Sequence, residues 1–274
     1  MLDNNFEPPR KGLPALEWYT MNQFSIIVRE PFSEDSPIEL HDLKDQELES
    51  IPILNQIRYI MQLIDEAGEM DLTRKGNLKR KVVRDIYSQN FFKDTLDLPI
   101  EPDDIYRQAD CVTVELTKIL LDISNLTKTR HNKYSLTKKG EDLLNKPNQL
   151  LTYFLKLYCN KFNMGYYDGC IEEIGNLGAG FSLILLSKYG DQSRKAKFYA
   201  DKYFKAFPDI LEKVEPKIGS KKEEGTRTYI YRIFKNFLNF FGLINITQEN
   251  NVREKYIQKT DLYNKFITCE LPQE

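Results

Sequence analysis

Two runs of basic residues are the groups in this sequence best suited to bind an anion. Residues 74–84 hold six cations and no acid, and residues 128–139 hold five cations and no acid. Lys and Arg at this density attract the phosphate groups of nucleic acids, although such a run can also be a solvated face balanced by acids elsewhere in the fold. The candidate nucleic-acid-binding residues are Arg74, Lys75, Lys79, Arg80, Lys81, Arg84, Lys128, Arg130 and Lys133.

Residues suited to catalysis or metal binding are scarce. The four cysteines have no C-x-x-C spacing, and neither of the two histidines, His41 and His131, lies near a cysteine in sequence. A zinc site usually takes closely spaced pairs of ligands, and a Ser–His–Asp or Cys–His site needs a suitable histidine. We therefore expect free thiols that are buried or half-buried, and we expect no metal, no cofactor and no catalytic residue.

Two other patterns could support chemistry but have simpler explanations. Gly175-Asn-Leu-Gly178-Ala-Gly180 is rich in glycine, yet it follows no clear strand and lacks the spacing of a phosphate-binding loop, so we expect a loop or close helix packing. Asp168, Glu172 and Glu173 could form a paired-carboxylate site for acid–base catalysis. The simpler interpretation is that these acidic residues lie at the solvent-exposed start of a helix. Because no nucleophile–base pair can be assembled, we expect no enzyme.

The composition is that of a globular chain. Of the 274 residues, 41% are hydrophobic and 29% are charged, and this length corresponds to one large domain or two to three small ones. No stretch approaches 18 consecutive apolar residues, and residues 1–30 contain no apolar segment typical of a signal peptide. We therefore expect a cytoplasmic protein without a membrane span.

Charge is distributed unevenly along the chain. Residues 1–50 carry 4 basic and 11 acidic side chains, a net charge of -7, whereas the rest carries 35 basic and 30 acidic side chains, a net charge of +5. This acidic N-terminal arm is either a solubilising tail or a segment that folds over the basic helix at 74–84 and competes with a polyanion.

Apolar periodicity and capping residues predict the elements around the first basic run. Apolar residues at helical spacing predict a helix that begins at Ile51 and ends at Gly68. Thr73 suits the N-cap of a second helix, which continues to about Gln89 and carries the basic residues on its outer face. Residues 112–123 predict a helix that is nearly apolar all round and should therefore be well buried.

The second basic run lies on a predicted β-hairpin. Leu126 and Tyr134 fall on opposing strands, and Arg130-His-Asn-Lys133 forms the turn. Thr137 suits the N-cap of the helix that follows. A helix, a hairpin with a basic tip and a Thr-capped helix is the way in which many winged-helix domains end.

The rest of the chain divides into three kinds of segment. Residues 1–50 look irregular apart from a strand-like stretch at 24–28, and residues 147–215 are typical of consecutive aromatic-rich helices. Residues 217–224 are a charged break that could serve as a linker. The last part predicts a helix over 230–241 closed by Gly242, strands over 243–247 and 255–258, and a short helix capped by Thr260.

An internal repeat is indicated by two observations. The pentapeptide Leu-Thr-[Arg/Lys]-Lys-Gly occurs at 72–76 and again at 136–140. The order helix, hairpin, Thr-capped helix is predicted at 111–145 and again at 227–267. The repeated order of elements is the stronger of the two indications, because a pentapeptide can recur by chance.

Eight short motifs, taken in order, carry a resemblance to a known family. They are Leu72-Thr-Arg-Lys-Gly-Asn-Leu78, Tyr134-Ser-Leu-Thr-Lys-Lys-Gly140, Phe162-Asn-Met-Gly-Tyr-Tyr-Asp-Gly169, Leu186-Ser-Lys-Tyr-Gly190, Phe198-Tyr-Ala-Asp201, Ala206-Phe-Pro208, Phe241-Gly-Leu243 and Lys259-Thr-Asp-Leu262. Over roughly residues 51–267 the sequence thereby resembles a set of uncharacterised bacterial proteins, some of them described as plasmid open-reading-frame-three-like. This resemblance implies no established activity and supplies no catalytic residues. A separate likeness to winged-helix domains covers mainly 101–145, with weaker versions at 51–90 and 227–267.

The expected fold class is mainly α with small β-hairpin wings, in which tandem winged-helix-like units surround a central helical segment. The expected divisions are an acidic N-terminal arm (1–50), a helix-turn-helix-like unit (51–100), a winged-helix-like unit (101–146), an aromatic-rich helical segment (147–216) and a second winged-helix-like unit (217–274).

We expect a winged-helix protein that binds nucleic acid without catalysing a reaction and that could have a regulatory role. Winged-helix modules commonly bind duplex DNA through a helix in the major groove and a basic wing on the phosphates. Two features count against this function, since the helix at 112–123 is mostly apolar and the net charge of the chain is -2. The alternative is a protein-interaction scaffold or adaptor that uses the same fold for docking or dimerisation. The expected partners are thus duplex DNA or another nucleic acid, a protein, or a second copy of the chain, and no membrane.

Overall fold

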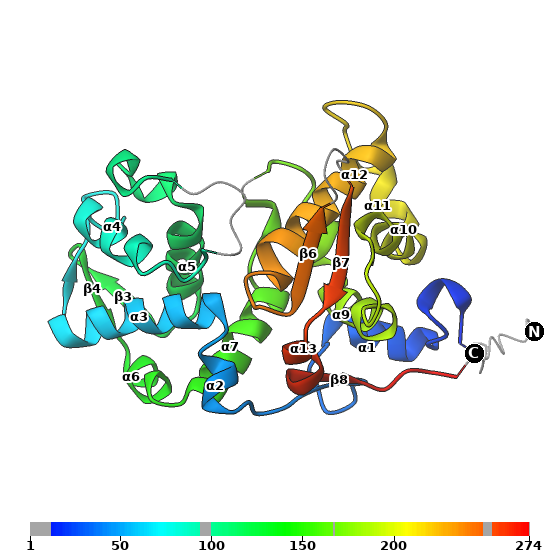
Figure 1. The fold of residues 1–274 in the computed structure, drawn as a ribbon, viewed down its shortest axis with the longest axis horizontal. Helices are drawn as coiled ribbons and strands as arrows, with labels where there is room; N and C mark the ends of the chain where they lie inside the picture. Colours follow the sequence, from blue (N-terminus) through cyan, green and yellow to red (C-terminus); the bar gives the residue numbers. More distant parts are fainter. Residues whose placement is uncertain (1–11, 94–99, 167, 249–253, 274) are drawn as a thin grey trace, which may run out of the picture. The chain divides into compact units, whose positions relative to one another are not determined.

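The computed structural model describes residues 12–93, 100–166, 168–248 and 254–273 (Figure 1). The chain forms two compact units. The terminal unit takes in Met1–His41, Asn163–Asn239 and Leu243–Glu274, and the central unit takes in Asp42–Phe162 and Phe240–Gly242. Over the described residues the fold is mainly helical with three small antiparallel sheets. None of the described helices combines the length and the hydrophobicity that a membrane span requires. The five divisions expected from the sequence stay a prediction.

The central unit consists of helices around one small sheet. Its longest apolar stripe lies on the first long helix, where Ile57, Ile60 and Ile64 are fully buried, and burial of each such side chain contributes roughly 1.5–3 kcal/mol. Gly68, with φ of 65°, ends this helix as predicted. The elements are α2 (Asp45–Leu48), α3 (Pro52–Ala67), β2 (Met70–Asp71), α4 (Arg80–Ser88), η2 (Pro102–Asp104), η3 (Gln108–Asp110), α5 (Val112–Ile123), β3 (Thr127–Arg130), β4 (Lys133–Leu136), α6 (Lys138–Leu144) and α7 (Pro147–Asn160).

The predicted start of the helix that carries the first basic run was wrong. Thr73 does not cap a helix, because residues 73–77 form a tight turn in which the Asn77 N–H donates to Thr73 Oγ1 at 3.1 Å. The turn is fixed because Leu72 and Leu78, both buried, pair across it as an antiparallel bridge. Helix α4 therefore begins only at Arg80.

The predicted hairpin and the helix after it are confirmed. His131 and Asn132 form the turn between β3 and β4, and both have positive φ, as a tight two-residue turn requires. Thr137 accepts a hydrogen bond from the Gly140 N–H at 3.2 Å and caps α6. A Cβ at Gly140 would lie 2.2 Å from the Leu126 carbonyl oxygen, so glycine is required there.

The terminal unit packs helices around an aromatic core. The ring of Tyr203 lies 4.5 Å from that of Tyr229 and 4.9 Å from that of Phe207, measured between centroids. Its elements are η1 (Pro14–Leu16), α1 (Met21–Arg29), β1 (Ile38–Leu40), η4 (Met164–Tyr166), α8 (Glu173–Asn176), α9 (Ala179–Tyr189), β5 (Arg194–Lys195), α10 (Ala196–Ala206), α11 (Pro208–Glu212), α12 (Lys221–Tyr229), the π-helical segment η5 (Ile230–Leu238), β6 (Ile244–Gln248), β7 (Lys255–Lys259), α13 (Asp261–Phe266) and β8 (Ile267–Cys269).

Two further predictions were wrong, both because a capping box was not recognised. The strand-like stretch at 24–28 is part of helix α1, whose N-cap Thr20 exchanges hydrogen bonds with Gln23. The described part of the N-terminal arm is therefore irregular only in part, since it also contains η1, β1 and α2. The charged break at 217–224 contains the start of α12, because Ser220 and Glu223 form a second capping box.

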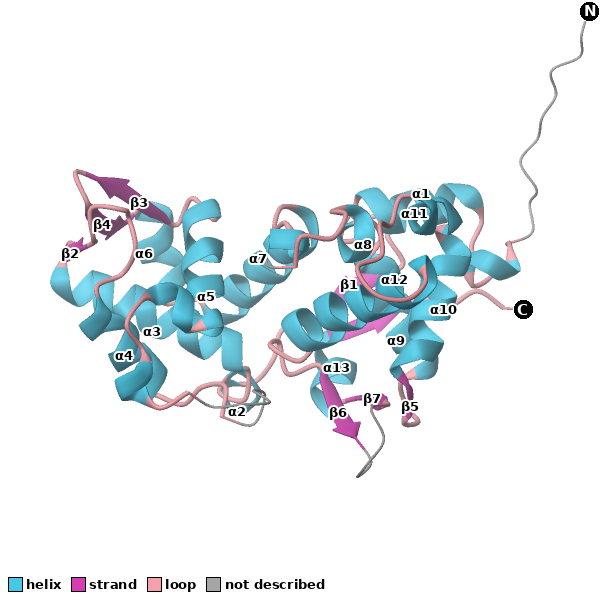
Figure 2. Cartoon of the chain, turned by 90° about the horizontal axis from the view of Figure 1, so that it is seen from above, coloured by secondary structure: helices cyan, strands magenta, loops and turns pink. Residues whose placement is uncertain are grey.

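The two units repeat the same order of elements. Helix, strand, helix, helix, hairpin and Thr-capped helix occur as α3 to α6 in the central unit and as α9 to α13 in the terminal unit, with the short α11 inserted. The two sheets also match, since their orders are β2-β4-β3 and β5-β7-β6 (Figure 2). The pentapeptide does not mark this repeat, because residues 72–76 form a turn whereas residues 136–140 lead from β4 into α6.

Candidate nucleic-acid interface

The sheet of the central unit has one buried and one cationic face. Side chains alternate between the faces of a strand, and the register places Arg130 opposite Lys133 and Thr129 opposite Tyr134. Tyr134 is fully buried. The outer face consists of Asp71, Lys128, Arg130, Lys133 and Ser135.

Asp71 links the outer face to the segment that leads into α4. Its carboxylate accepts hydrogen bonds from Lys133 Nζ at 2.5 Å and from Lys79 Nζ at 2.7 Å. The hydrogen bond from Lys133 and then that from Lys79 lower the pKa of Asp71 to about 2, and Asp71 raises the pKa of Lys133. All three side chains are exposed, so solvent screens these pairs and they order the surface more than they stabilise the fold.

The turn at 73–77 adds two cations at the same end of the sheet. The Leu72 N–H donates to the Asn132 carbonyl oxygen at 2.8 Å, so this turn begins beside the tip of the hairpin. Arg74 and Lys75 are exposed on it. The group that we call the basic sheet end therefore comprises Arg74, Lys75, Lys79, Lys128, Arg130 and Lys133.

Most cations of the basic sheet end have no partner within the described part of the chain. Lys79 and Lys133 are paired with Asp71, as described above. In contrast, Arg74, Lys75, Lys128 and Arg130 make no side-chain hydrogen bond or ion pair there, and all four are exposed. Asp71 pairs with two of the six cations, and the nearby charge of Glu69 also raises the pKa of Lys133, so the basic sheet end as a whole keeps a positive charge.

The two arginines of α4 are engaged within the unit instead. Arg80 Nε donates to the Ile105 carbonyl oxygen at 2.9 Å, and its guanidinium stacks on the exposed ring of Tyr106. Arg84 Nε donates to the same carbonyl at 3.1 Å, and Arg84 forms an ion pair with Asp103. Both side chains thus fasten residues 103–106 to α4, while Lys81 is exposed and has no partner among the described residues.

Helix α5, which precedes the hairpin, is buried as predicted. Its one lysine, Lys118, is only 3% exposed, donates to the Asp122 carboxylate at 2.6 Å and lies over the Tyr134 ring at 4.2 Å. A helix whose cation is used inside the unit has no basic face with which to enter the groove of a duplex.

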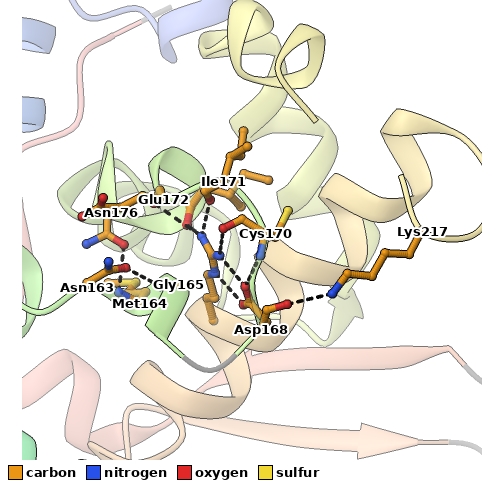
Figure 3. Close-up of polar contacts among 11 residues, drawn as sticks. Asn163, Met164, Gly165, Asp168, Cys170, Ile171, Glu172, Asn176 and Lys217 are labelled. Atoms are coloured by element: carbon orange, nitrogen blue, oxygen red, sulfur yellow. Dashed lines mark hydrogen bonds and ion pairs between the residues drawn. The ribbon is translucent and has the colours of Figure 1, made fainter. Parts of the chain in front are cut away.

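The carboxylates at 168–173 serve the structure of the terminal unit. Asp168 binds the guanidinium of Arg232 through both oxygens, with Nε at 2.7 Å and Nη2 at 2.6 Å. Arg232 is fully buried and also donates to the carbonyl oxygens of Cys170, Ile171 and Ile174 (Figure 3). These contacts tie the irregular segment before α9 to η5.

The glycine-rich stretch leads from α8 into α9 and is closely packed, in line with the expected loop or close helix packing. Gly175 has φ of 85°, and its N–H donates to the Tyr203 hydroxyl at 3.1 Å. Gly178 has φ of 78°, and a Cβ there would lie 2.5 Å from the Phe207 ring. Positive φ and close ring packing explain both glycines.

The cysteines are free, as expected from the sequence. Cys111 and Cys159 are buried, and Cys170 and Cys269 are half-buried. Burial raises the pKa of the Cys111 thiol and raises that of Cys269 to about 11, so both thiols stay protonated at neutral pH. Over the described ranges, no group of three or more His, Cys, Asp or Glu side chains could hold a metal ion.

Sequence reasoning missed a second group of cations, which lies on the terminal unit. Arg227, Tyr231 and Lys235 line one wall of a groove with a volume of about 620 Å³, and Lys197 and Lys255 line its other parts. The spacing of four residues between Arg227, Tyr231 and Lys235 was the available signal, since it places them on one face of the helix.

Comparison with known proteins supports a family likeness for part of the chain. Neither the curated proteins nor the solved structures include a significant match to it. A family model described as the Y4jL N-terminal domain matches residues 49–149, which span α3 to the start of α7 and so most of the central unit. The basic sheet end lies wholly inside this range. Residues 49–149 are therefore similar to the Y4jL N-terminal domain.

Proposed function

We propose that this protein binds nucleic acid through the basic sheet end of the central unit, without catalysis. The observation that carries the proposal is the convergence of six cations from a turn, the N-cap of α4 and two strands, four of them without a partner among the described residues. Exposed Lys and Arg side chains of this kind bind nucleic acids by neutralising the phosphate groups of the backbone.

The proposed architecture of both units is winged-helix-like. Its support is the shared order of elements and the shared sheet order, in which a lone strand pairs with the second strand of a hairpin. The hairpin β3–β4 then takes the part of the wing, with Lys128, Arg130 and Lys133 on its outer face.

The proposed mode of binding is phosphate contact by the wing and the neighbouring turn. Helix α5, which would enter the major groove in a winged-helix module, is buried. Arg80 and Arg84 of α4 are engaged with residues 103–106. Neither helix therefore presents a free arginine to the edge of a base. Contacts to phosphate position a protein on nucleic acid but do not read its sequence. We therefore expect binding that tolerates changes of sequence.

The scaffold alternative has weaker support in the central unit. Among its described residues, the exposed large apolar side chains are Tyr106, at 63% exposure, and Val112, at 39%. Tyr106 is partly covered by the guanidinium of Arg80. Docking surfaces usually need a contiguous apolar patch of a few hundred Å², and two side chains fall short of that.

The test is fluorescence anisotropy of a labelled random-sequence duplex at about 50 and 200 mM salt. If six phosphates are neutralised, affinity should fall on the order of a thousandfold across that range. The double variant Lys128→Ala/Arg130→Ala should weaken binding at low salt and lower the salt slope by about two.

The matched control removes two exposed cations elsewhere in the same unit, as Lys156→Ala/Lys161→Ala. It should leave both the affinity and the salt slope close to those of the unmodified chain. Equal losses of affinity in the two double variants would show that the overall charge of the protein, and not the basic sheet end, attracts the duplex. Absence of binding by the unmodified chain at the lower salt concentration would refute the proposal.

A further inference from the structure

The central unit contains a pocket with largely aromatic walls. Helices α3, α4 and α5 contact one another in pairs (Figure 1), and side chains from all three helices or from the turn after α4 line a pocket of about 400 Å³. Tyr87, Phe91 and Phe92 supply its rings, and Gln56 and Thr113 supply polar groups. Apolar walls with a few polar groups, in a volume of about 300–1,000 Å³, are typical of small-molecule sites.

Two of the rings are held in place by other rings of the same unit. The Phe91 ring lies 5.7 Å from that of Tyr59, and the Phe92 ring lies 4.8 Å from that of Phe240, measured between centroids. These contacts keep the walls in position when the pocket is empty. A preformed site favours binding, because less conformational freedom is lost when the ligand enters.

Gln56 presents a hydrogen-bond acceptor to this pocket. Its side chain is only 2% exposed, and its Nε2 donates to the Thr113 carbonyl oxygen at 2.8 Å and to Thr117 Oγ1 at 2.7 Å. Because a main-chain carbonyl can only accept, the first of these bonds fixes which end of the amide carries the protons. Gln56 Oε1 then has no donor among the described residues, yet it is not sealed inside the protein, so it is open to the pocket.

This oxygen favours a ligand that donates a hydrogen bond. A buried acceptor that lacks a donor is unfavourable, and an N–H group on the ligand would satisfy Gln56 Oε1. The main-chain and hydroxyl acceptors next to it already receive both protons of the Gln56 amide. The amide therefore has an oxygen to offer the ligand and no proton.

The size and the charge of the pocket narrow the class of ligand further. A cavity of about 150 Å³ holds one benzene ring, so a pocket of about 400 Å³ has room for two fused rings. Flat ring systems pack well against aromatic side chains. Lys93 also lines the pocket, and none of its described lining residues is acidic, so a positively charged ligand is disfavoured.

We propose that this pocket binds a small bicyclic aromatic molecule without positive charge, whose ring N–H donates to Gln56 Oε1 and whose rings pack against Tyr87, Phe91 and Phe92. The inference does not depend on the proposed function, because the pocket and the basic sheet end share no residue. Indole, which has two fused rings and one N–H, is the probe for this class.

The experiment compares indole with benzofuran, which has the same shape but an ether oxygen in place of the N–H. Binding of each probe to the full chain is followed by a ligand-observed NMR titration. Indole should bind about fivefold to tenfold more tightly, because benzofuran leaves Gln56 Oε1 without a donor. Absence of indole binding at millimolar concentration, or equal affinities of the two probes for the unmodified chain, would overturn the inference.

Three variants locate the site. Gln56→Leu should remove the preference for indole over benzofuran. Phe91→Ala should weaken the binding of both probes and leave their ratio unchanged. Tyr106→Ala is the matched control, since it removes an exposed ring of the same unit that does not line the pocket, and it should change neither affinity.

Two results with the variants would also overturn the inference. One is a preference for indole that persists in Gln56→Leu, and the other is an equal loss of affinity in Phe91→Ala and Tyr106→Ala. If Gln56→Leu does not fold, the comparison of the two probes on the unmodified chain and on Phe91→Ala still decides. The duplex-binding test of Lys128→Ala/Arg130→Ala remains separate, because it does not involve this pocket.

Discussion

Arg232 is the side chain whose removal should most destabilise the terminal unit. In the variant Arg232→Met, the Asp168 carboxylate loses both of its bonds to the guanidinium, and the carbonyl oxygens of Cys170, Ile171 and Ile174 lose a donor. Removing one partner of a buried ion pair costs about 3–5 kcal/mol because the remaining charge is left without compensation. Asp168 retains 20% exposure of its side chain, so water offsets part of this loss and we expect a value of about 3 kcal/mol.

The assay is urea unfolding followed by the fluorescence of Trp18. This is the single tryptophan of the chain, and it is half-buried in the same unit as Arg232, so its signal reports the unfolding of that unit. The change in midpoint multiplied by the m-value gives the loss of unfolding free energy.

Arg227→Met is the matched control, because Arg227 lies five residues earlier, on α12, and its side chain is 53% exposed whereas that of Arg232 is fully buried. Water reaches the exposed guanidinium and screens its ion pair with Glu224, so such a pair contributes about 0–1 kcal/mol and this variant should unfold almost as the unmodified chain does. The reasoning would be refuted if Arg232→Met lost less than about 1 kcal/mol, the range of an exposed pair, or if both variants shifted the midpoint equally.

Two further predictions concern local contacts. Burial raises the pKa of Glu17, but hydrogen bonds from Lys202 and Tyr189 outweigh it and bring the pKa below its usual 4.5. The stability that Glu17 contributes is therefore present above about pH 4.5 and is lost as the pH falls through the lowered pKa. The difference in unfolding free energy between pH 7 and pH 3, measured with urea, should be smaller for Glu17→Gln than for the unmodified chain. An equal difference in the two proteins would contradict this. Thr137→Ala removes the N-cap of α6 and should cost about 1 kcal/mol in thermal or urea unfolding, whereas Thr137→Ser should cost much less; equal losses would exclude the cap as the cause.

Local patterns in the sequence predicted several elements well. The helix that ends at Gly68, the turn at 131–132 and the cap at Thr137 depend on residues within a few positions of one another. Such features need only the periodicity of the chain and the hydrogen bonds of nearby side chains. The burial of α5 was also predictable, because a helix that is apolar all round has no face suited to water.

Some local patterns were ambiguous without their surroundings. A short apolar run such as 24–28 fits a strand or a buried helix, and the capping box at Thr20 decides for the helix. The pentapeptides at 72–76 and 136–140 share their residue types but not their structures, because Leu72 pairs with Leu78 whereas Leu136 ends a strand. Neighbours in space set the conformation of both segments.

The sequence by itself determined the helix that ends at Gly68, the buried helix α5, the hairpin β3–β4, the cap at Thr137 and the presence of two basic runs. It did not determine which cations are free to bind a partner. Arg80, Arg130 and Arg232 look alike in sequence, yet Arg80 holds the Ile105 carbonyl, Arg232 is buried against Asp168 and Arg130 is exposed. Only the tertiary structure decided this, because a charge is engaged or free according to partners that lie 25 to 64 positions away in the chain and that only folding brings within hydrogen-bond distance.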